Sequence, residues 1–417
     1  MSEWLEKPLG QLAKFQKGRK VETSEYEQDG YDGYLGASAL EGEVEGYAST
    51  KLAVRANPSD VLMLWDGERS GLVGHNLSGV VSSTVSRITP SNEITSSYLY
   101  YHLLSRFEWI QGRRTGTGVP HVPKDLSRIL KVYYPRKLSE QNAIVAVLAS
   151  IDAAIKRTET LIAKYQQIKA GLMHDLFTRG VTADGKLRPP REQAPELYHE
   201  TPIGWMPKEW GCKSVEQLLA PVGNNLRSGP FGSALLKSEL VEEGIPFLGI
   251  DNIHTEHFEA TFTRRVSRQK YLELNRYSVR PRDVVITIMG TVGRCCVLPA
   301  DIGEALSSKH LWTMTFDKTQ VIFELVCWQL NYAPWVLSWF RRESQGAVMD
   351  AIQSSTLRSL MLPVPSISEQ QEIFKKFSAC HTMVESEQGS LAKLVQEKLG
   401  LMHDLLTGRV RVKVKKI

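Results

Sequence analysis

One stretch of this chain occurs twice, at 138–181 and at 367–410, and the repeat constrains the fold more than any other feature. The copies align without a gap at an offset of 229 positions, and each opens on Ser-Glu-Gln and closes near Gly-Leu-Met-His-Asp-Leu. Self-similarity at a fixed offset indicates a structural unit that is present more than once. Because this offset has the length of a domain plus a long helix, the sequence predicts two copies of one unit rather than a solenoid.

Each copy is predicted to form one long helix. Apolar residues recur every seven positions in two neighbouring rows, a pattern typical of a helix that buries one face against another helix. In the first copy the rows are Ile144, Ile151, Thr158, Tyr165 and Leu172, with Leu148, Ile155, Ile162 and Leu176 beside them. About 40 residues give a helix of roughly 60 Å. Ser139 and Ser368 are the expected N-caps. The alternative is a pair of core helices in one large domain.

Length and composition restrict the class of protein. A chain of 417 residues predicts two or three domains with sizeable cores. Its hydrophobic share of 42% and charged share of 23% are ordinary for globular proteins, and the net charge of +5 permits a polyanionic partner. We expect no membrane span and no signal peptide, because apolar runs are short and the first residues are polar. Five cysteines without metal-ligand spacing favour reduced thiols in the cytoplasm and no bound metal.

The two blocks that precede the repeats are remotely similar. Residues 3–12 resemble 209–218, Pro58–Leu62 resembles Pro281–Val285, and Ser82-Ser83 corresponds to Ser307-Ser308. Each block holds short apolar strands, an apolar helix and a proline just before the repeat, which predicts a small α+β domain. The expected order is a domain at 1–137, a helix at 138–180, a linker at 181–207, a second domain at 208–366, a second helix at 367–408 and a basic tail at 409–417.

This organisation resembles the specificity subunit of Type I restriction-modification systems. The resemblance rests on the Ser-Glu-Gln opening of each helix, the GLMHDLLTGRVRV-like close, the GPFGS segment at Gly229–Ser233, and the order block, helix, block, helix. It covers nearly the whole chain. The first block departs from the pattern, because it has Gln16–Lys20 near the place where a GxFGS segment is expected.

The resemblance implies an α+β fold with two target recognition domains, each reading one half of a bipartite double-stranded DNA target. The two helices would pack as an antiparallel coiled coil with a pseudo-two-fold repeat, set the spacing between the half-sites, and dock two methyltransferase subunits. Motor-nuclease restriction subunits would join the complex. The chain itself would catalyse no reaction and bind no cofactor, since S-adenosylmethionine is expected on the methyltransferase.

The candidate DNA-binding residues are cationic and polar side chains on predicted loops, where phosphate and base contacts are usually made. Any one of them alone is more simply explained as a solvated charge or a turn residue. The set is Lys17, Arg19, Lys20, Arg113, Arg114, Thr115 and Thr117 in the first block, and Asn224, Asn225, Arg227, Ser228, Thr291, Arg294 and Lys309 in the second.

Catalytic interpretations are weaker. Gly180–Lys186 has the spacing of a P-loop but follows a helix and lacks the required Ser or Thr. The acids Asp60, Asp66 and Glu68 lack the Glu-x-Lys of a metal nuclease, and the repeated His-Asp pairs are adjacent on a helix and so do not face each other. Two other functions remain open: a coiled-coil protein scaffold without a DNA role, and a stand-alone DNA nuclease or methylase. DNA binding by the blocks separates the first from the specificity subunit.

Overall fold

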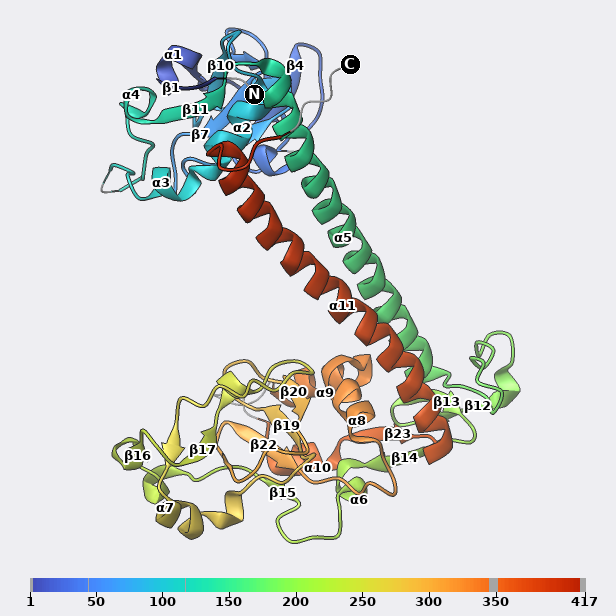
Figure 1. Ribbon diagram of the computed structural model, residues 1–417. Coiled ribbons are helices and arrows are strands. Elements are labelled where there is room, and N and C mark those ends of the chain that lie inside the picture. The colour runs from blue at the N-terminus through green and yellow to red at the C-terminus, as the bar shows by residue number, and fades with distance from the viewer. Residues whose placement is uncertain (1–2, 44, 117, 345–351, 413–417) are drawn as a thin grey trace. The chain divides into compact units, whose positions relative to one another are not determined.

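A computed structural model of the chain describes residues 3–43, 45–116, 118–344 and 352–412, with 343 and 344 described by their backbone alone. The chain divides into two compact units. Unit 1 comprises Met1–Ile162 and Ser386–Ile417, and unit 2 comprises Ala163–Glu385. Each unit contains one α+β domain and one segment from each of two long helices, α5 (Leu138–Thr178) and α11 (Ile367–Leu406), which can be followed in Figure 1.

The domain of unit 1 is built from short strands and four short helices. Its helices are α1 (Leu9–Leu12), α2 (Ser96–Ser105), α3 (Phe107–Gln111) and α4 (Leu126–Ile129). Its strands are β1 (Trp4–Pro8), β2 (Ala13–Lys17), β3 (Thr23–Ser24), β4 (Tyr31–Leu35), β5 (Tyr47–Ser49), β6 (Arg55–Ala56), β7 (Val61–Leu64), β8 (Val73–His75), β9 (Gly79–Val81), β10 (Val85–Pro90) and β11 (Lys131–Pro135).

Unit 2 also combines short strands with short helices. Its helices are α6 (Val215–Leu218), α7 (Arg268–Glu273), α8 (Phe323–Tyr332), α9 (Pro334–Ser344) and α10 (Ser354–Ser359). Its strands are β12 (Tyr198–Thr201), β13 (Gly204–Pro207), β14 (Gly211–Ser214), β15 (Leu226–Arg227), β16 (Leu240–Val241), β17 (Ile245–Leu248), β18 (Arg265–Val266), β19 (Val284–Thr287), β20 (Cys295–Val297), β21 (Leu306–Ser307), β22 (Leu311–Met314) and β23 (Met361–Val364).

The two domains share the topology of their main sheet, as their remote sequence similarity predicts, whereas the second sheet has the order β3-β5-β4-β9-β6 in unit 1 and β16-β18-β17-β21 in unit 2. A four-stranded antiparallel sheet runs β2-β10-β7-β8 in unit 1 and β15-β22-β19-β20 in unit 2. A two-stranded pair closes each domain before its long helix, β1 with β11 and β14 with β23. In each domain a single parallel pairing occurs in the second sheet, β4 with β9 and β17 with β21. The α+β fold with two similar domains is therefore confirmed.

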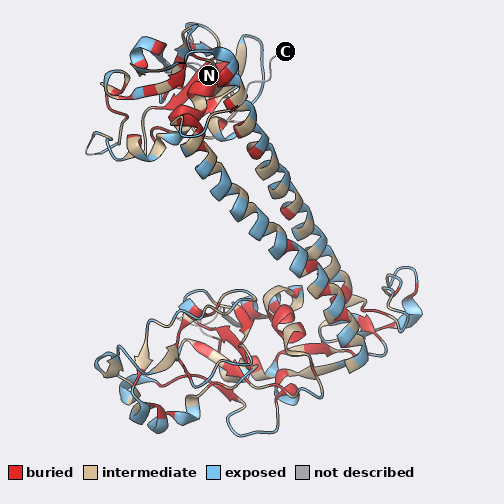
Figure 2. Cartoon of the chain, in the orientation of Figure 1, coloured by how far each residue is buried: buried red, intermediate tan, exposed pale blue. Residues whose placement is uncertain are grey.

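The long helices complete the cores of the domains at repeat-equivalent positions. In unit 1, Ile144, Leu148, Met402, Leu405 and Leu406 belong to the main apolar cluster. In unit 2, the residues displaced by 229 positions form a separate apolar cluster with Leu325 and Trp328 of α8: Ile373, Phe377, Met173, Leu176 and Phe177. Because α5 contributes its first turns and α11 its last turns in unit 1, and the reverse holds in unit 2, the helix segments within each unit run antiparallel. Figure 2 shows buried residues gathered toward the ends of both helices.

The predicted caps of the helices need one correction. The hydroxyl of Ser366, not of Ser368, accepts from the backbone N–H of Glu369 at 3.3 Å, so the N-cap of α11 lies two residues earlier than expected. At the other ends, Gly180 and Gly408 adopt positive φ angles of 63° and 70°, the usual conformation of a residue that terminates a helix.

The segment at 181–207 is more ordered than a linker. Strands β12 and β13 form an antiparallel hairpin within it, Tyr198 and Met206 are buried, and Arg188 is 5% exposed. The expected lack of a long apolar run does not hold for α5, which by length and composition alone could cross a membrane. The most apolar window of α5 reaches a mean hydropathy of 1.3, which a core helix can also reach, and Ile144 and Leu148 of that helix lie in the unit 1 core.

Candidate nucleic-acid interface

An open hollow lies beside the GPFGS segment in unit 2. Its volume is about 170 Å³, and its wall combines apolar side chains with the basic residues Lys237, Arg264, Lys309 and His310. Burial lowers the pKa of His310, and the positive charges of Lys309 and Arg264 lower it further. Phe231 lies between the rim residues Pro230 and Gly232 and is 60% exposed. A concave cationic surface with an exposed aromatic ring suits a phosphate backbone and a stacked base.

Of the predicted residues, only Lys309 lines this hollow. Lys237 and Arg264 were missed, because cations between short strands carry no sequence pattern that separates them from ordinary surface charges. The topology identifies them: Arg264 precedes β18, whose neighbour β17 carries Phe247 on the same wall.

Arg227 and Ser228, which are both predicted to contact DNA, are buried and do not line that hollow. Arg227 is 5% exposed and its guanidinium pairs with Asp283, while its Nε donates to the Ser278 carbonyl at 2.6 Å. Burial lowers the pKa of Arg227 and raises the pKa of Asp283, because loss of water penalises both charges. The Ser228 hydroxyl donates to the carbonyl of Lys309 at 3.3 Å. Ser228 therefore supports the turn that carries Lys309, whereas Arg227 supports the chain at Asn224 and Ser278.

The remaining predicted residues of unit 2 lie on turns outside the hollow. Asn224 is exposed with a φ of 53°, and Asn225 donates to the Ala220 carbonyl at 3.0 Å. Thr291 and Arg294 lie on the turn between β19 and β20, as expected for a turn that follows a strand. Thr291 is exposed and Arg294 is half-buried.

In unit 1, the structure brings the two predicted segments together at Asp66. Lys17, at the end of β2, places its Nζ 2.7 Å from one carboxylate oxygen, and His121 places its Nδ1 2.7 Å from the other. The backbone of His121 pairs with that of Thr115 through two hydrogen bonds of 2.8 and 3.0 Å. Asp66 thus joins the start of the 17–20 segment to the 115–121 loop.

The other cations of unit 1 that are predicted to bind DNA lie on the surface or are partly exposed. Arg19 and Lys20 are exposed. Arg113 lies 4.0 Å from the ring centroid of Trp109, and Arg114 donates to the Gln111 carbonyl at 3.0 Å. Thr117 lies outside the described residues. Of the acids considered for a metal nuclease, Asp66 pairs with Lys17, and the buried Asp60 accepts from the hydroxyl of Thr89 at 2.5 Å.

Gly18 occupies the place of Gly229, an equivalence that the missing GxFGS segment concealed. A Cβ atom would come within 2.4 Å of the Val81 carbonyl oxygen at Gly18, and within 2.2 Å of the equivalent Ser307 carbonyl oxygen at Gly229. Only glycine fits such a close approach of two backbones. The strand registers also shift the alignment of Ser82-Ser83 with Ser307-Ser308 by one residue. Leu35 pairs with Val81, and the equivalent Leu248 pairs with Ser307. Ser82 therefore corresponds to Ser308, and Ser83 to Lys309.

The glutamine of each Ser-Glu-Gln opening ties a long helix to its domain. The Nε2 of Gln141 donates to the carbonyls of Glu93 and Pro135 at 2.9 and 3.0 Å, and its Oε1 accepts from the N–H of Thr95 at 2.8 Å. Gln370 makes the same three bonds in unit 2, to the segment before α8 and the turn before α11. Both glutamines are buried, so the repeated motif is explained by the fold.

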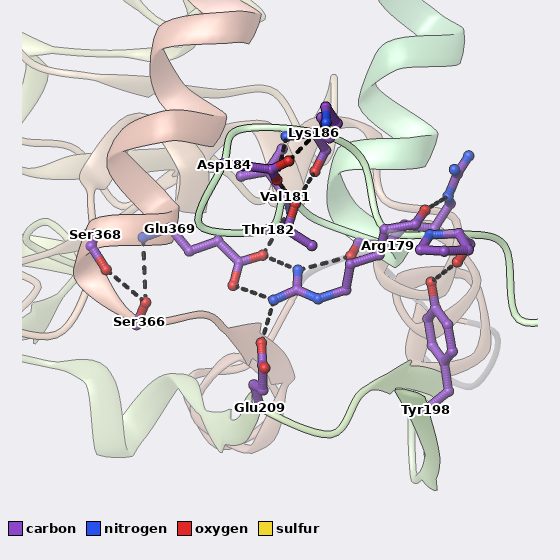
Figure 3. A network of polar contacts seen from close by, with 12 residues as sticks. Arg179, Val181, Thr182, Asp184, Lys186, Tyr198, Glu209, Ser366, Ser368 and Glu369 are labelled. Atoms are coloured by element: carbon purple, nitrogen blue, oxygen red, sulfur yellow. Dashed lines mark hydrogen bonds and ion pairs between the residues drawn. The ribbon is translucent and has the colours of Figure 1, made fainter. Parts of the chain in front are cut away.

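The glutamate of each opening binds an arginine that follows the close of the other helix. In unit 2, Glu369 pairs with Arg188 and accepts from the N–H of Val181 at 2.9 Å, while Arg188 also pairs with Glu209 (Figure 3). Burial opposes the charge of Arg188, but the bonds to Glu369 and Glu209 outweigh it and raise its pKa.

Unit 1 has the equivalent junction. Glu140 lies 3.6 Å from Arg411 and accepts from the indole N–H of Trp4 at 3.3 Å. Arg411 also stacks over the Trp4 ring at 4.6 Å. Each junction thus closes a domain onto both helices.

The repeated His-Asp pairs differ in their polar contacts: Asp175 pairs with Arg179 at 3.0 Å, whereas the His403 ring lies 2.8 Å from the Arg409 guanidinium. His174 and His403 are exposed, whereas the leucine and methionine residues around them contribute to the cores. Packing therefore explains the apolar part of the motif but not the histidines. Within the part of the chain that the structure describes, no group of three or more His, Cys, Asp or Glu side chains could hold a metal ion.

These features define a tandem-repeat protein with two similar domains whose cationic surfaces differ in detail. The profile of the Type I restriction modification DNA specificity domain matches the chain twice, over residues 1–167 and 232–396. The chain belongs to this family, whose members recognise DNA targets.

Relatives and solved structures agree. The specificity subunit of the Type I restriction enzyme MjaVIII from Methanocaldococcus jannaschii is 26% identical over 99% of this chain and 94% of its own. That of EcoBI from Escherichia coli is 20% identical over 96% and 83%. The crystal structure of a Type I S subunit from M. genitalium has a TM-score of 0.60 at 14% identity, covering 97% of this chain and 96% of its own. A chain from a study of type I R-M complex assembly and conformational transition has a TM-score of 0.56 at 16% identity, covering 98% of both.

Proposed function

We propose that the chain is the specificity subunit of a Type I restriction-modification complex, in which each domain reads one half of a bipartite DNA target. The observation that carries this proposal is one topology present twice with different side chains on its loops. Lys309 in unit 2 has Ser83 as its counterpart in unit 1, and Ser228 has Lys17. Different loops on one scaffold would read different sequences, so the target would not be a palindrome.

The two long helices set the distance between the half-sites, and methyltransferase subunits dock on the complex, two per chain. The subunit then contributes recognition only. S-adenosylmethionine and the chemistry of adenine methylation belong to the methyltransferase, DNA cleavage belongs to motor-nuclease subunits, and the complex works in the cytoplasm, where its DNA is. Two repeat-equivalent exposed histidines, His174 and His403, support a repeated contact with one kind of partner.

Exchange of residues 1–137 for the matching domain of a relative tests whether each domain reads one half of the DNA target. Methylome sequencing of cells with the hybrid complex is expected to show one altered half-site and one unchanged half-site. A target altered in both halves, or in neither, would contradict the proposal.

Docking is tested by light scattering of complexes formed with the methyltransferase. His174→Ala and His403→Ala are each expected to reduce the bound copies from two toward one, and the double variant to lose both. Lys164→Ala, at an exposed position of α5 that is outside the motif, is the matched control and should retain both copies.

A further inference from the structure

Glu256 is a buried carboxylate to which neither the sequence motifs nor the DNA-facing surface assigns a role. It lies in the connection between β17 and β18, its side chain is 8% exposed, and its φ angle is 63°. Its backbone N–H donates to the Cys295 carbonyl at 2.9 Å, which holds the connection against β20. A residue other than glycine with a positive φ indicates a conformation that the surroundings impose.

The carboxylate of Glu256 contacts three helices. Its Oε1 accepts from the ammonium of Lys169 on α5 at 2.8 Å and from the hydroxyl of Tyr332 on α8. Its Oε2 accepts from the indole N–H of Trp328 on α8 at 3.0 Å and lies 3.4 Å from Nδ1 of His381 on α11. Burial and the hydrogen bond to Glu256 raise the pKa of Tyr332, so this hydroxyl remains a donor. The carboxylate is therefore fully bonded and neutralised only while this connection stays on the helices.

The equivalent position in unit 1 is built differently. Lys398, which is repeat-equivalent to Lys169, pairs at 2.7 Å with Asp152 of α5. Asp152 is repeat-equivalent to His381, so in unit 1 the long helices supply both the cation and the acid. In unit 2, histidine replaces that acid and the domain supplies the carboxylate through Glu256. The lysine is thus retained in both repeats, but only in unit 2 does it depend on a loop of the globular domain.

The strands on either side of this connection lead directly to the cationic hollow. Phe247 of β17 and Arg264, just before β18, line its wall, and Arg264 also pairs with Asp251 at the start of the connection. Displacement of Glu256 from the helices would therefore shift the two strands that form this wall. A shift of about 1 Å at a recognition surface can reduce a reaction rate on the order of 100-fold.

We propose that Glu256 is a positioning residue that holds the cationic hollow of the second domain at a fixed place on its helix pair, and thereby determines which central gap of a two-part target is accepted. The proposal rests on the proposed function, since it assumes that the helices set the gap. It assigns to one loop carboxylate the connection between the spacer and the second DNA-reading surface.

The test uses the full complex with its methyltransferase and DNA duplexes that carry the target mapped by methylome sequencing, with the native gap and with gaps one base pair longer and shorter. Glu256→Ala is expected to lower the methylation rate at the native gap roughly 10- to 100-fold. Its preference for the native gap over the altered gaps should fall, whereas its discrimination against a base change in the first half-site should remain. Glu304→Ala, which breaks the exposed Arg268–Glu304 pair of the same domain, is the control and should behave like the wild type.

A double variant separates positioning from simple stability. In Glu256→Ala/His381→Asp, Lys169 regains an acid at the position that Asp152 occupies in unit 1, so the thermal stability should return while the gap preference stays weakened. Wild-type gap preference in Glu256→Ala, or its recovery in the double variant, would overturn the proposal. If the wild-type complex itself methylates all gaps equally, the spacer function fails instead, and the two failures are distinguishable.

Discussion

At the scale of the residue, burial decides which cations can meet DNA. Arg227 and Lys309 are both cations of the second domain near one turn, yet Arg227 is 5% exposed and paired with Asp283, whereas Lys309 is exposed on the wall of the hollow. A buried pair cannot release its arginine without leaving the carboxylate uncompensated. When the exposed Lys309 contacts a phosphate, counterions of the nucleic acid are released, and this release is the usual source of affinity for a phosphate backbone.

Lys309→Ala is therefore expected to weaken binding of target and non-target duplexes alike in the assembled complex. The plot of log K against log salt concentration should become less steep by about 0.9, since one phosphate contact is lost. Fluorescence anisotropy across a salt series measures both quantities. Lys318→Ala removes an exposed lysine elsewhere in the same domain and should leave the slope unchanged. Equal slopes for all three proteins would remove Lys309 from the interface.

His102 gives unit 1 a pH dependence of known sign. It is 1% exposed on α2, and burial, together with the charge of Arg106, lowers its pKa to about 4. Since its pKa in the unfolded chain is about 6.5, the unfolded state binds more protons between these values. Stability from the neutral imidazole is present above about pH 6.5 and is lost as the pH falls toward 4. We expect a loss of about 2 kcal/mol from this group between pH 7 and pH 5.

Chemical unfolding of the wild type and of His102→Phe at pH 7 and pH 5 measures this loss. The phenylalanine variant starts from a lower stability, because its ring cannot bond the Lys131 carbonyl, but it should lose less between the two pH values. An identical loss in both proteins would assign the pH dependence to other groups.

At the scale of the element, the repeat could be recognised in the sequence because equivalent residues make equivalent contacts in the two units. The heptad rows, the lengths of the helices and the α+β class of the domains follow from apolar spacing, and all are present. The Gln141 and Gln370 clamps, Arg188 and Gly18 could not be predicted, because their partners lie far away in sequence and only the folded register brings them together. Lys237 and Arg264, which line the hollow of unit 2, were missed for the same reason.

The glutamine clamps make a matched pair of tests. Gln141→Ala leaves the carbonyls of Glu93 and Pro135 and the N–H of Thr95 without their bonds, and should destabilise unit 1 by about 3 kcal/mol at roughly 1 kcal/mol per bond. Gln370→Ala should destabilise unit 2 by a similar amount. Hydrogen exchange can assign each loss to its unit. The exposed neighbours Asn142 and Gln371 provide controls, and alanine there should change little.

At the scale of the whole molecule, the proposed spacer consists of two helices of 41 and 40 residues, so its length would depend on residue number rather than on surface chemistry. An insertion of seven residues in both helices, after Ile162 and after Glu385, preserves the apolar rows because it adds one complete heptad. It lengthens each helix by about 10 Å and leaves the rotation about 20° short of two full turns. That length corresponds to roughly three base-pair steps of about 3.4 Å.

Methylation of the native target should therefore be lost, and methylome sequencing should reveal a target with unchanged half-sites and a central gap longer by about three base pairs. Alanine at the exposed positions Glu159 and Gln167 changes the surface of α5 without changing its length, and should leave the native gap intact. Since a rigid spacer cannot serve two gaps equally, modification of the original target at the normal rate by the insertion protein would mean that another element sets the distance.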